Sequence, residues 1–81
     1  GQFYVLGTLA RRGIGARAAR LAFERFPGIW QVTQVPENLP AIAFWRAVIG
    51  AHTGGRFDET VLPDPQEEGE PRNVMLFTSP A

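Results

Sequence analysis

The segment RRGIGARAAR, residues 11–20, constrains the fold of this chain most, because two glycines stand where a helix is about to begin. Glycine costs about 1 kcal/mol relative to alanine inside a helix. Gly13 and Gly15 must therefore meet a need other than helix formation. The apolar run FYVL, residues 3–6, precedes them and is typical of a buried strand. The segment thus predicts a strand, a glycine-rich turn and a helix over residues 13–26.

Apolar spacing and glycine or proline punctuation predict the other elements. Pro27 and Gly28 end the first helix. A strand is expected over residues 29–35, a helix over residues 41–49 that ends at Gly50, and strands over residues 57–62 and 73–78. Residues 63–72 are acidic and contain proline, which predicts a mobile loop. The first helix should pack on the sheet through Ala18, Leu21, Ala22 and Phe26, leaving Arg17, Arg20 and Glu24 exposed.

The element order predicts a single mixed α+β domain over residues 1–81, an α/β arrangement of the order β-α-β-α-β-β. The first strand, helix and strand should form a right-handed βαβ unit with parallel strands. The last two strands should form an antiparallel hairpin. The sheet is therefore expected to contain both parallel and antiparallel pairs.

Composition excludes several kinds of site. The chain has no cysteine, and its one histidine, His52, disfavours a zinc site made by protein ligands alone. We therefore expect no metal. The net charge is zero, so no overall field attracts nucleic acid or an acidic membrane. No apolar run approaches the ~20 residues of a membrane span, and the N-terminus has no signal-peptide pattern. We expect a soluble, cytoplasmic protein.

A strand, a glycine-rich turn and a helix start together predict a phosphate site. The first amide N–H groups of a helix lack partners, and the helix dipole adds roughly half a positive charge at that end. Gly13 and Gly15 leave room for a phosphate, while Arg11 and Arg12 add charge. The alternative is that these glycines only turn the chain and let the helix pack closely on the sheet.

The stretch GIGARA also fits the dinucleotide-binding pattern G-x-G-x-x-G/A. Glu37 lies about 20 residues further on, where a ribose-binding carboxylate is expected. However, residues 7–12 separate the glycines from the preceding strand, whereas dinucleotide-binding glycines follow their strand almost directly. A dinucleotide-binding fold also continues with further parallel strands, whereas this chain is predicted to end in a hairpin.

Two motifs resemble the GNAT superfamily of acetyl-coenzyme A-dependent N-acetyltransferases. ARRGIGA, residues 10–16, is similar to the central motif [QR]-x-x-G-x-[GA], with Ala10 where glutamine or arginine is usual. NLPAIAFW is similar to the second motif N-x-x-A-x-x-F-[YW], through Asn38, Ala41, Phe44 and Trp45. The two motifs occur in order with a predicted strand between them, which makes the resemblance more specific than either motif alone.

The resemblance implies that acetyl-CoA is the cosubstrate. It implies that the backbone of Tyr4, Val5 and Leu6 bonds the pantetheine arm. Asn38 would reach the pantetheine, and Trp45 would belong to the cofactor site. For Asn38 the alternative is a simple helix cap. Phe44 and Trp45 have the spacing of core residues, and at least Phe44 is expected to be buried. The pyrophosphate would be held by the amides of Arg11, Arg12, Gly13, Ile14, Gly15 and Ala16.

The implied reaction is direct attack of an amine on the thioester, which needs a base and an acid. Many GNAT members use a tyrosine as the acid where this chain has Trp45, whose indole N–H donates a hydrogen bond but is not a usable acid. Tyr4 and His52 are conceivable participants, and no catalytic residue is assigned. The acceptor amine is not identified. The alternative functions are a non-catalytic module that binds acyl-CoA or a partner protein, and a dinucleotide-binding fragment.

The resemblance covers only the C-terminal half of the GNAT fold, beginning at its fourth strand. The chain is therefore expected to be a fragment, a natural truncation or half of an intertwined assembly. Residues 3–6 would then form a strand with one bare edge, and an exposed apolar edge invites pairing. This predicts a homodimer, or a missing N-terminal half that covers the edge.

Overall fold

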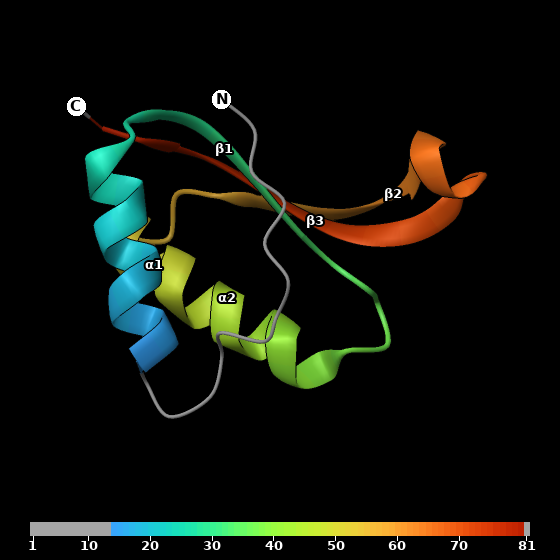
Figure 1. The fold of residues 1–81 in the computed structure, drawn as a ribbon, viewed down its shortest axis with the longest axis horizontal. Coiled ribbons are helices and arrows are strands. Elements are labelled where there is room, and N and C mark those ends of the chain that lie inside the picture. Colours follow the sequence, from blue (N-terminus) through green and yellow to red (C-terminus); the bar gives the residue numbers. More distant parts are fainter. Residues whose placement is uncertain (1–13, 81) are drawn as a thin grey trace.

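The computed structural model describes residues 14–80, which form two helices on one face of a three-stranded antiparallel sheet (Figure 1). The predicted mixed α+β class is confirmed, whereas the predicted strand at residues 3–6 and its parallel pairing lie outside the described residues. Neither described helix is long and apolar enough to cross a membrane. The elements are α1 (Ile14–Arg25), β1 (Gly28–Gln34), α2 (Leu39–Thr53), β2 (Asp58–Asp64), the 3-10 turn η2 (Pro65–Glu67) and β3 (Glu70–Ser79).

The last strand, β3, lies in the middle of the sheet, whose order is β1-β3-β2. Its antiparallel register with β1 runs from Gly28 opposite Ser79 to Gln34 opposite Asn73. Its register with β2 runs from Asp58 opposite Leu76 to Asp64 opposite Glu70. The predicted hairpin of the last two strands is therefore confirmed, and it is β3 rather than β2 that joins this hairpin to β1.

The loop expected over residues 63–72 is shorter than predicted, because both strands continue into that segment and only the η2 turn and two further residues connect them. The Asp64 side chain accepts a hydrogen bond from the Gln66 backbone N–H at 2.9 Å. It also pairs with the Arg72 guanidinium, Nε to Oδ2, at 3.3 Å. Asp64 thus stabilises the turn of the hairpin, although the acidic and proline content of this segment is typical of a loop.

The face by which α1 packs also differs from the prediction. Ala19 and Phe23 are buried, at 6% and 1% exposure, whereas Leu21 and Phe26 are 58% and 52% exposed. Residues four apart share one side of a helix, so Ala19 and Phe23 form the stripe that packs inward. Phe26 lies beyond the end of α1 at Arg25 and leaves that side. Of the other predicted core positions, Ala18 is exposed and Ala22 is half-buried; Arg17, Arg20 and Glu24 are exposed as predicted.

Helix α2 is longer than predicted at its C-terminal end. The Asn38 side chain caps its first turn, and Thr53 is its last residue. Gly50, the predicted stop, is inside the helix; Gly54 ends it instead, with a left-handed φ of 65° and an N–H bonded to the Gly50 carbonyl. Glycine adopts this conformation without the steric cost that a Cβ brings. The buried side of α2 consists of Ala41, Ile42, Trp45, Val48 and Ile49.

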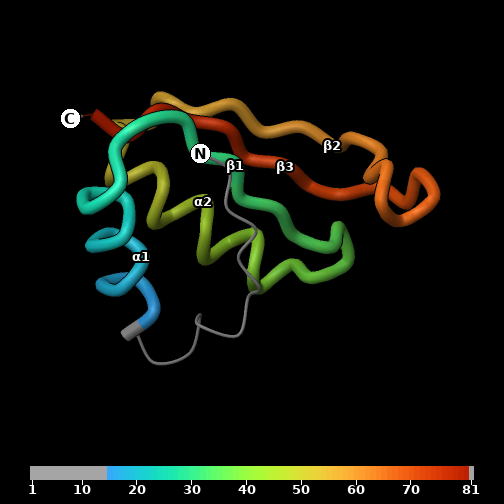
Figure 2. The backbone as a smooth tube through the Cα atoms, turned by 45° about the horizontal axis from the view of Figure 1, so that its top comes forward, coloured from blue at the N-terminus to red at the C-terminus, as the bar shows by residue number. Residues whose placement is uncertain are grey.

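An aromatic cluster joins α1 to the sheet. The Phe23 ring meets Trp30 of β1 and Phe77 of β3 edge to face, with centroids 4.8 and 4.9 Å apart. Trp30 and Phe77 stack across the strand pair at 6.3 Å. The ring centroid of Trp45, on α2, lies 6.5 Å from that of Phe23. The core therefore holds both helices against the same face of the sheet, as Figure 2 also shows.

Candidate functional site

The N-terminus of α1 lies inside the RRGIGA segment that predicts a phosphate site. The helix begins at Ile14, and its first turn contains no acidic residue. The first amide N–H groups of a helix have no intrahelical acceptor, so this end suits an anion. Gly15 is buried and Ala16 is half-buried. The other predicted cofactor residues of this region lie outside the described residues: Tyr4, Val5, Leu6, Arg11, Arg12 and Gly13.

Asn38 stands at the start of α2 and is exposed. Its Oδ1 accepts a hydrogen bond from the Ala41 backbone N–H at 3.2 Å. The helix-cap interpretation of Asn38 is therefore confirmed. Its contact with pantetheine stays a prediction.

Trp45, and not Phe44, is the fully buried member of the second motif. Trp45 is 1% exposed, and Phe44 is half-buried with its ring packed edge to face on the indole at 4.9 Å. The expectation that Phe44 is buried is therefore wrong in degree. Adjacent residues point about 100° apart around a helix, so only one of the two can face the centre of the sheet. Within the described part of the chain, the buried Trp45 Nε1 has no hydrogen-bond partner.

His52 joins three elements through a hydrogen bond of its Nε2 to the Ser79 hydroxyl. The Ser79 hydroxyl donates to the Phe23 carbonyl at 2.7 Å. His52 Nε2 lies 2.8 Å from the same hydroxyl oxygen. Because serine has a single hydroxyl proton, Nε2 must be the donor in that second hydrogen bond. The imidazole thus ties the C-terminal end of α2 to β3 and α1.

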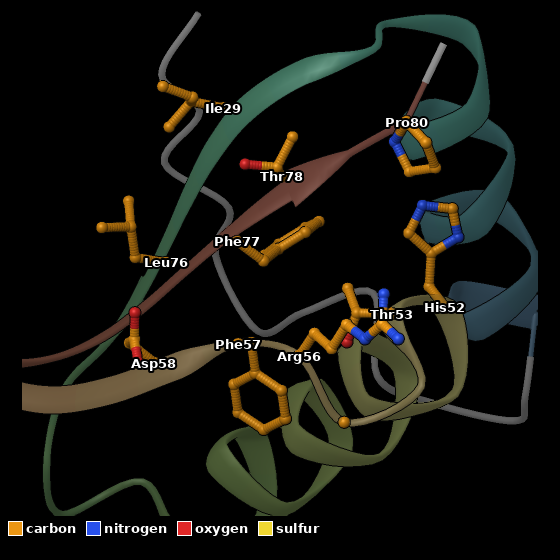
Figure 3. Close-up of a pocket in the computed structure, with 11 residues that line it drawn as sticks. Ile29, His52, Thr53, Arg56, Phe57, Asp58, Leu76, Phe77, Thr78 and Pro80 are labelled. Atoms are coloured by element: carbon orange, nitrogen blue, oxygen red, sulfur yellow. The ribbon is translucent and has the colours of Figure 1, made fainter.

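A groove of about 820 Å³ lies at the end of the sheet beside His52 (Figure 3). It is bounded by the segment that leads from α2 into β2 and by the last residues of β3. Arg56 and Asp58 bring opposite charges to it, and Phe57 and Phe77 bring aromatic surface. Only His52 among these residues stands out in the sequence, since they are scattered from Ile29 to Pro80 and follow no motif.

A polar network that the sequence analysis missed links α2 to all three strands. Arg46 donates two hydrogen bonds to Glu59, from Nε at 2.9 Å and from Nη2 at 2.7 Å. Asn73 Nδ2 donates to Glu59 Oε2 at 3.2 Å and to the Gln34 side-chain oxygen at 2.8 Å. The Arg46 hydrogen bond, helped by Asn73, lowers the pKa of Glu59 although burial opposes this. A carboxylate held in this way is a poor proton acceptor.

No family model, curated protein or solved structure matches this chain. A functional assignment must therefore be argued from its motifs and from the geometry of residues 14–80. Among those residues, no three histidine, aspartate or glutamate side chains gather closely enough to hold a metal ion.

Proposed function

We propose that this chain binds acetyl-CoA with the pyrophosphate at the N-terminus of α1, and transfers the acetyl group to an amine. One observation carries the proposal: α1 begins at Ile14, inside the segment that resembles the GNAT phosphate-binding motif. The first turn of the helix is free of acidic side chains that would repel a phosphate. Arg11 and Arg12 would add positive charge next to it.

The second motif supports the same proposal from α2. Asn38 caps the helix, and Trp45 faces inward from its second turn. β1 connects the two motif helices and pairs along one edge with β3. The opposite edge of β1 is where residues 3–6 would add a parallel strand in the C-terminal half of a GNAT fold. Pairing of two chains through residues 3–6 belongs to the same proposal.

In the proposed reaction the acceptor nitrogen attacks the thioester carbonyl, the C–N bond forms, and the C–S bond breaks. The amine must lose a proton and the CoA thiolate must gain one. Trp45 cannot supply a proton for this, and Nε2 of His52 is occupied by Ser79. Tyr4 is the remaining candidate for the acid named in the sequence analysis.

Trp45 and His52 also favour a second candidate function, a module that binds acyl-CoA without transferring the acyl group. Trp45 stands where many GNAT members have their acidic tyrosine. The two functions are separated by a thioester-cleavage assay on a panel of amines. Amine-dependent release of CoA supports the transferase, and binding of acetyl-CoA without release supports the module.

The dinucleotide alternative receives less support. Its fold needs parallel neighbours, whereas each of the described strands pairs antiparallel with its neighbour. Glu37 is exposed in the turn between β1 and α2.

The glycine-rich segment is tested by changing Gly15 to valine. A bulky side chain in the first turn of α1 should exclude the pyrophosphate and weaken acetyl-CoA binding at least about tenfold, or 1.4 kcal/mol. The matched control is Ala18→Val, which adds the same kind of side chain at an exposed position of the same helix. Thermal unfolding followed by circular dichroism checks that both variants are folded.

Because Gly15 is buried, Gly15→Ala adds a milder variant with a single methyl group. Folded Gly15 variants that bind acetyl-CoA as tightly as Ala18→Val would show that this glycine serves packing alone.

A further inference from the structure

The edge of β3 that faces β2 has no paired strand along the last three residues of β3. β2 begins at Asp58, which lies opposite Leu76, so its pairing with β3 ends there. On the other edge, β1 continues to pair with β3 as far as Ser79. Residues 77–79 therefore have a neighbouring strand on one side only, and we call their other side the free edge of β3.

The free edge presents backbone hydrogen-bonding groups without a partner in the described part of the chain. In an antiparallel sheet, successive residues direct their N–H and C=O groups to opposite neighbours. At least one of residues 77–79 therefore directs both groups away from β1. Outside the helices and the strand pairs, no backbone–backbone hydrogen bond of residues 14–80 involves these three residues. An unpaired edge of this kind can pair with another extended chain.

A tight turn keeps the segment before β2 away from the free edge. Gly54 and Gly55 both have a left-handed φ, of 65° and 85°. The N–H groups of residues 55–57 donate to carbonyls of α2 and of the turn itself, at 2.9, 3.3 and 3.1 Å. The Phe57 ring lies beside Gly50 of α2. The segment is thus held against α2, and the groove beside His52 lies between it and the end of β3 (Figure 3).

The groove offers an added strand apolar surface on both sides. Leu76 is exposed on the face of the sheet that the helices leave open, and the half-buried Phe57 lies on the helix side. Successive side chains of a strand point to opposite faces, so alternate residues of an added strand would reach one or the other. A chain with apolar residues on both sides of its backbone fits this groove.

The charges that line the groove select among such chains. Arg56 is exposed and takes part in neither of the ion pairs found within residues 14–80, so its guanidinium can receive a carboxylate. Asp58 is exposed at the start of β2 and would repel an acidic side chain directly beside it. The pair therefore favours one acidic residue near Arg56 over a continuous acidic run.

We propose that the free edge of β3 and this groove bind an extended peptide of a partner protein as an additional strand in line with β2. The peptide backbone pairs with residues 77–79, and its apolar side chains lie on Leu76 and Phe57. One glutamate or aspartate of the peptide pairs with Arg56. The groove lies past the C-terminal end of α1, whereas the proposed pyrophosphate site is at its N-terminus, so this inference does not rest on the proposed function.

Two capped peptides test the charge preference, acetyl-Thr-Val-Glu-Val-Thr-amide and the same peptide with lysine in place of glutamate. They are titrated into the isotope-labelled chain and followed by two-dimensional NMR. The glutamate peptide should shift the amide signals of residues 77–79 and bind about fivefold more tightly than the lysine peptide, as an exposed ion pair allows. Arg56→Glu should reverse this order. Arg20→Glu, at an exposed position of α1 outside the groove, is the control and should keep it.

A third peptide tests the backbone pairing. It has the side chains of the glutamate peptide but carries N-methyl groups on its three central residues, which removes the donors that a paired strand needs. It should no longer shift the amide signals of residues 77–79. Thermal unfolding followed by circular dichroism checks that the Arg56→Glu and Arg20→Glu chains are folded.

Three results would contradict the proposal. A folded wild-type chain whose residues 77–79 do not respond to the glutamate peptide would overturn it. Equal binding of the N-methylated peptide would show that no strand is added. Equal affinities for the glutamate and lysine peptides would overturn the role given to Arg56.

Discussion

Phe23 and Phe26 are three residues apart, yet one is the most buried side chain of α1 and the other is half-exposed. The sequence pattern grouped Phe26 with Ala18 and Ala22 because all three recur at intervals of four. Ala19 and Phe23 recur at the same interval one position later, and a run of alanines cannot distinguish the two stripes. The difference is decided by where the helix ends, since α1 stops at Arg25, and by the two aromatic rings that receive Phe23.

Truncation of these two rings should therefore have very different costs. Phe23→Ala removes a ring that touches Trp30 and Phe77 and leaves a cavity, so it should lower the free energy of unfolding by about 3–5 kcal/mol. Phe26→Ala, at 52% exposure, should cost well under half of that. Chemical denaturation of both variants measures the difference. Equal losses would mean that the buried face of α1 is assigned wrongly.

Glu59 gives the stability a specific dependence on pH. Its folded pKa is lowered, chiefly by the hydrogen bond from Arg46. A lowered folded pKa contributes stability above the unfolded value of about 4.3, and that contribution is lost as the pH falls through the folded pKa. The contribution is modest because the Arg46 side chain is 57% exposed.

The melting temperature of the wild type should therefore exceed that of Glu59→Gln at pH 7, and the gap should shrink as the pH is lowered below about 4. Glu24→Gln removes the same charge from an exposed position of α1 and serves as control. A gap that stays constant from neutral to acid pH would contradict the role given to the Arg46–Glu59 pair.

Among the elements, a helix end that is marked by a capping side chain could be predicted from the sequence. A helix end at which two glycines could each stop the helix could not. Asn38 and Pro40 mark the start of α2 through a cap and a first-turn proline, and the structure agrees. At the other end, Gly50 and Gly54 are equally suitable in sequence. Gly54 ends the helix because it has the left-handed conformation, while Gly50 keeps helical pairing.

Alanine at these two glycines should change stability in opposite directions. Gly54→Ala forces a Cβ into a left-handed residue and should cost about 1 kcal/mol, although no atom obstructs that Cβ. Gly50→Ala lies inside the helix, and its Cβ would meet the Phe57 ring at an ordinary 3.7 Å. It should gain about 0.5–1 kcal/mol from helix propensity. Thermal unfolding of the pair checks this, and destabilisation by Gly50→Ala would contradict the helix end at Gly54.

At the scale of the whole molecule, the sequence predicts the elements better than their arrangement. The hairpin of β2 and β3 follows from two adjacent strands, but nothing local says which strand of the hairpin joins β1. That choice is made by contacts distant in sequence, such as Trp30 on Phe77 and Asn73 on Gln34. The bond between His52 and Ser79 is likewise a product of the fold, and it gives a structural role to a residue that the sequence offered as a base.

The candidate site also has features that could be predicted from the sequence and a feature that could not. The start of α1 within RRGIGA and the cap at Asn38 could be predicted because each depends on neighbouring residues. The groove beside His52 could not, because it exists only once residues scattered from Ile29 to Pro80 line one hollow. A hollow formed by residues so distant in sequence has no spacing that would reveal it.

Binding of the acetyl-CoA pyrophosphate at the α1 N-terminus is the step on which the proposed function depends. Isothermal titration calorimetry of the wild-type chain with acetyl-CoA, and separately with NAD at the same concentrations, tests it most directly. We expect saturable binding of one acetyl-CoA per chain and no binding of NAD. Binding of NAD in place of acetyl-CoA, or no heat with acetyl-CoA from a chain shown to be folded, would contradict it.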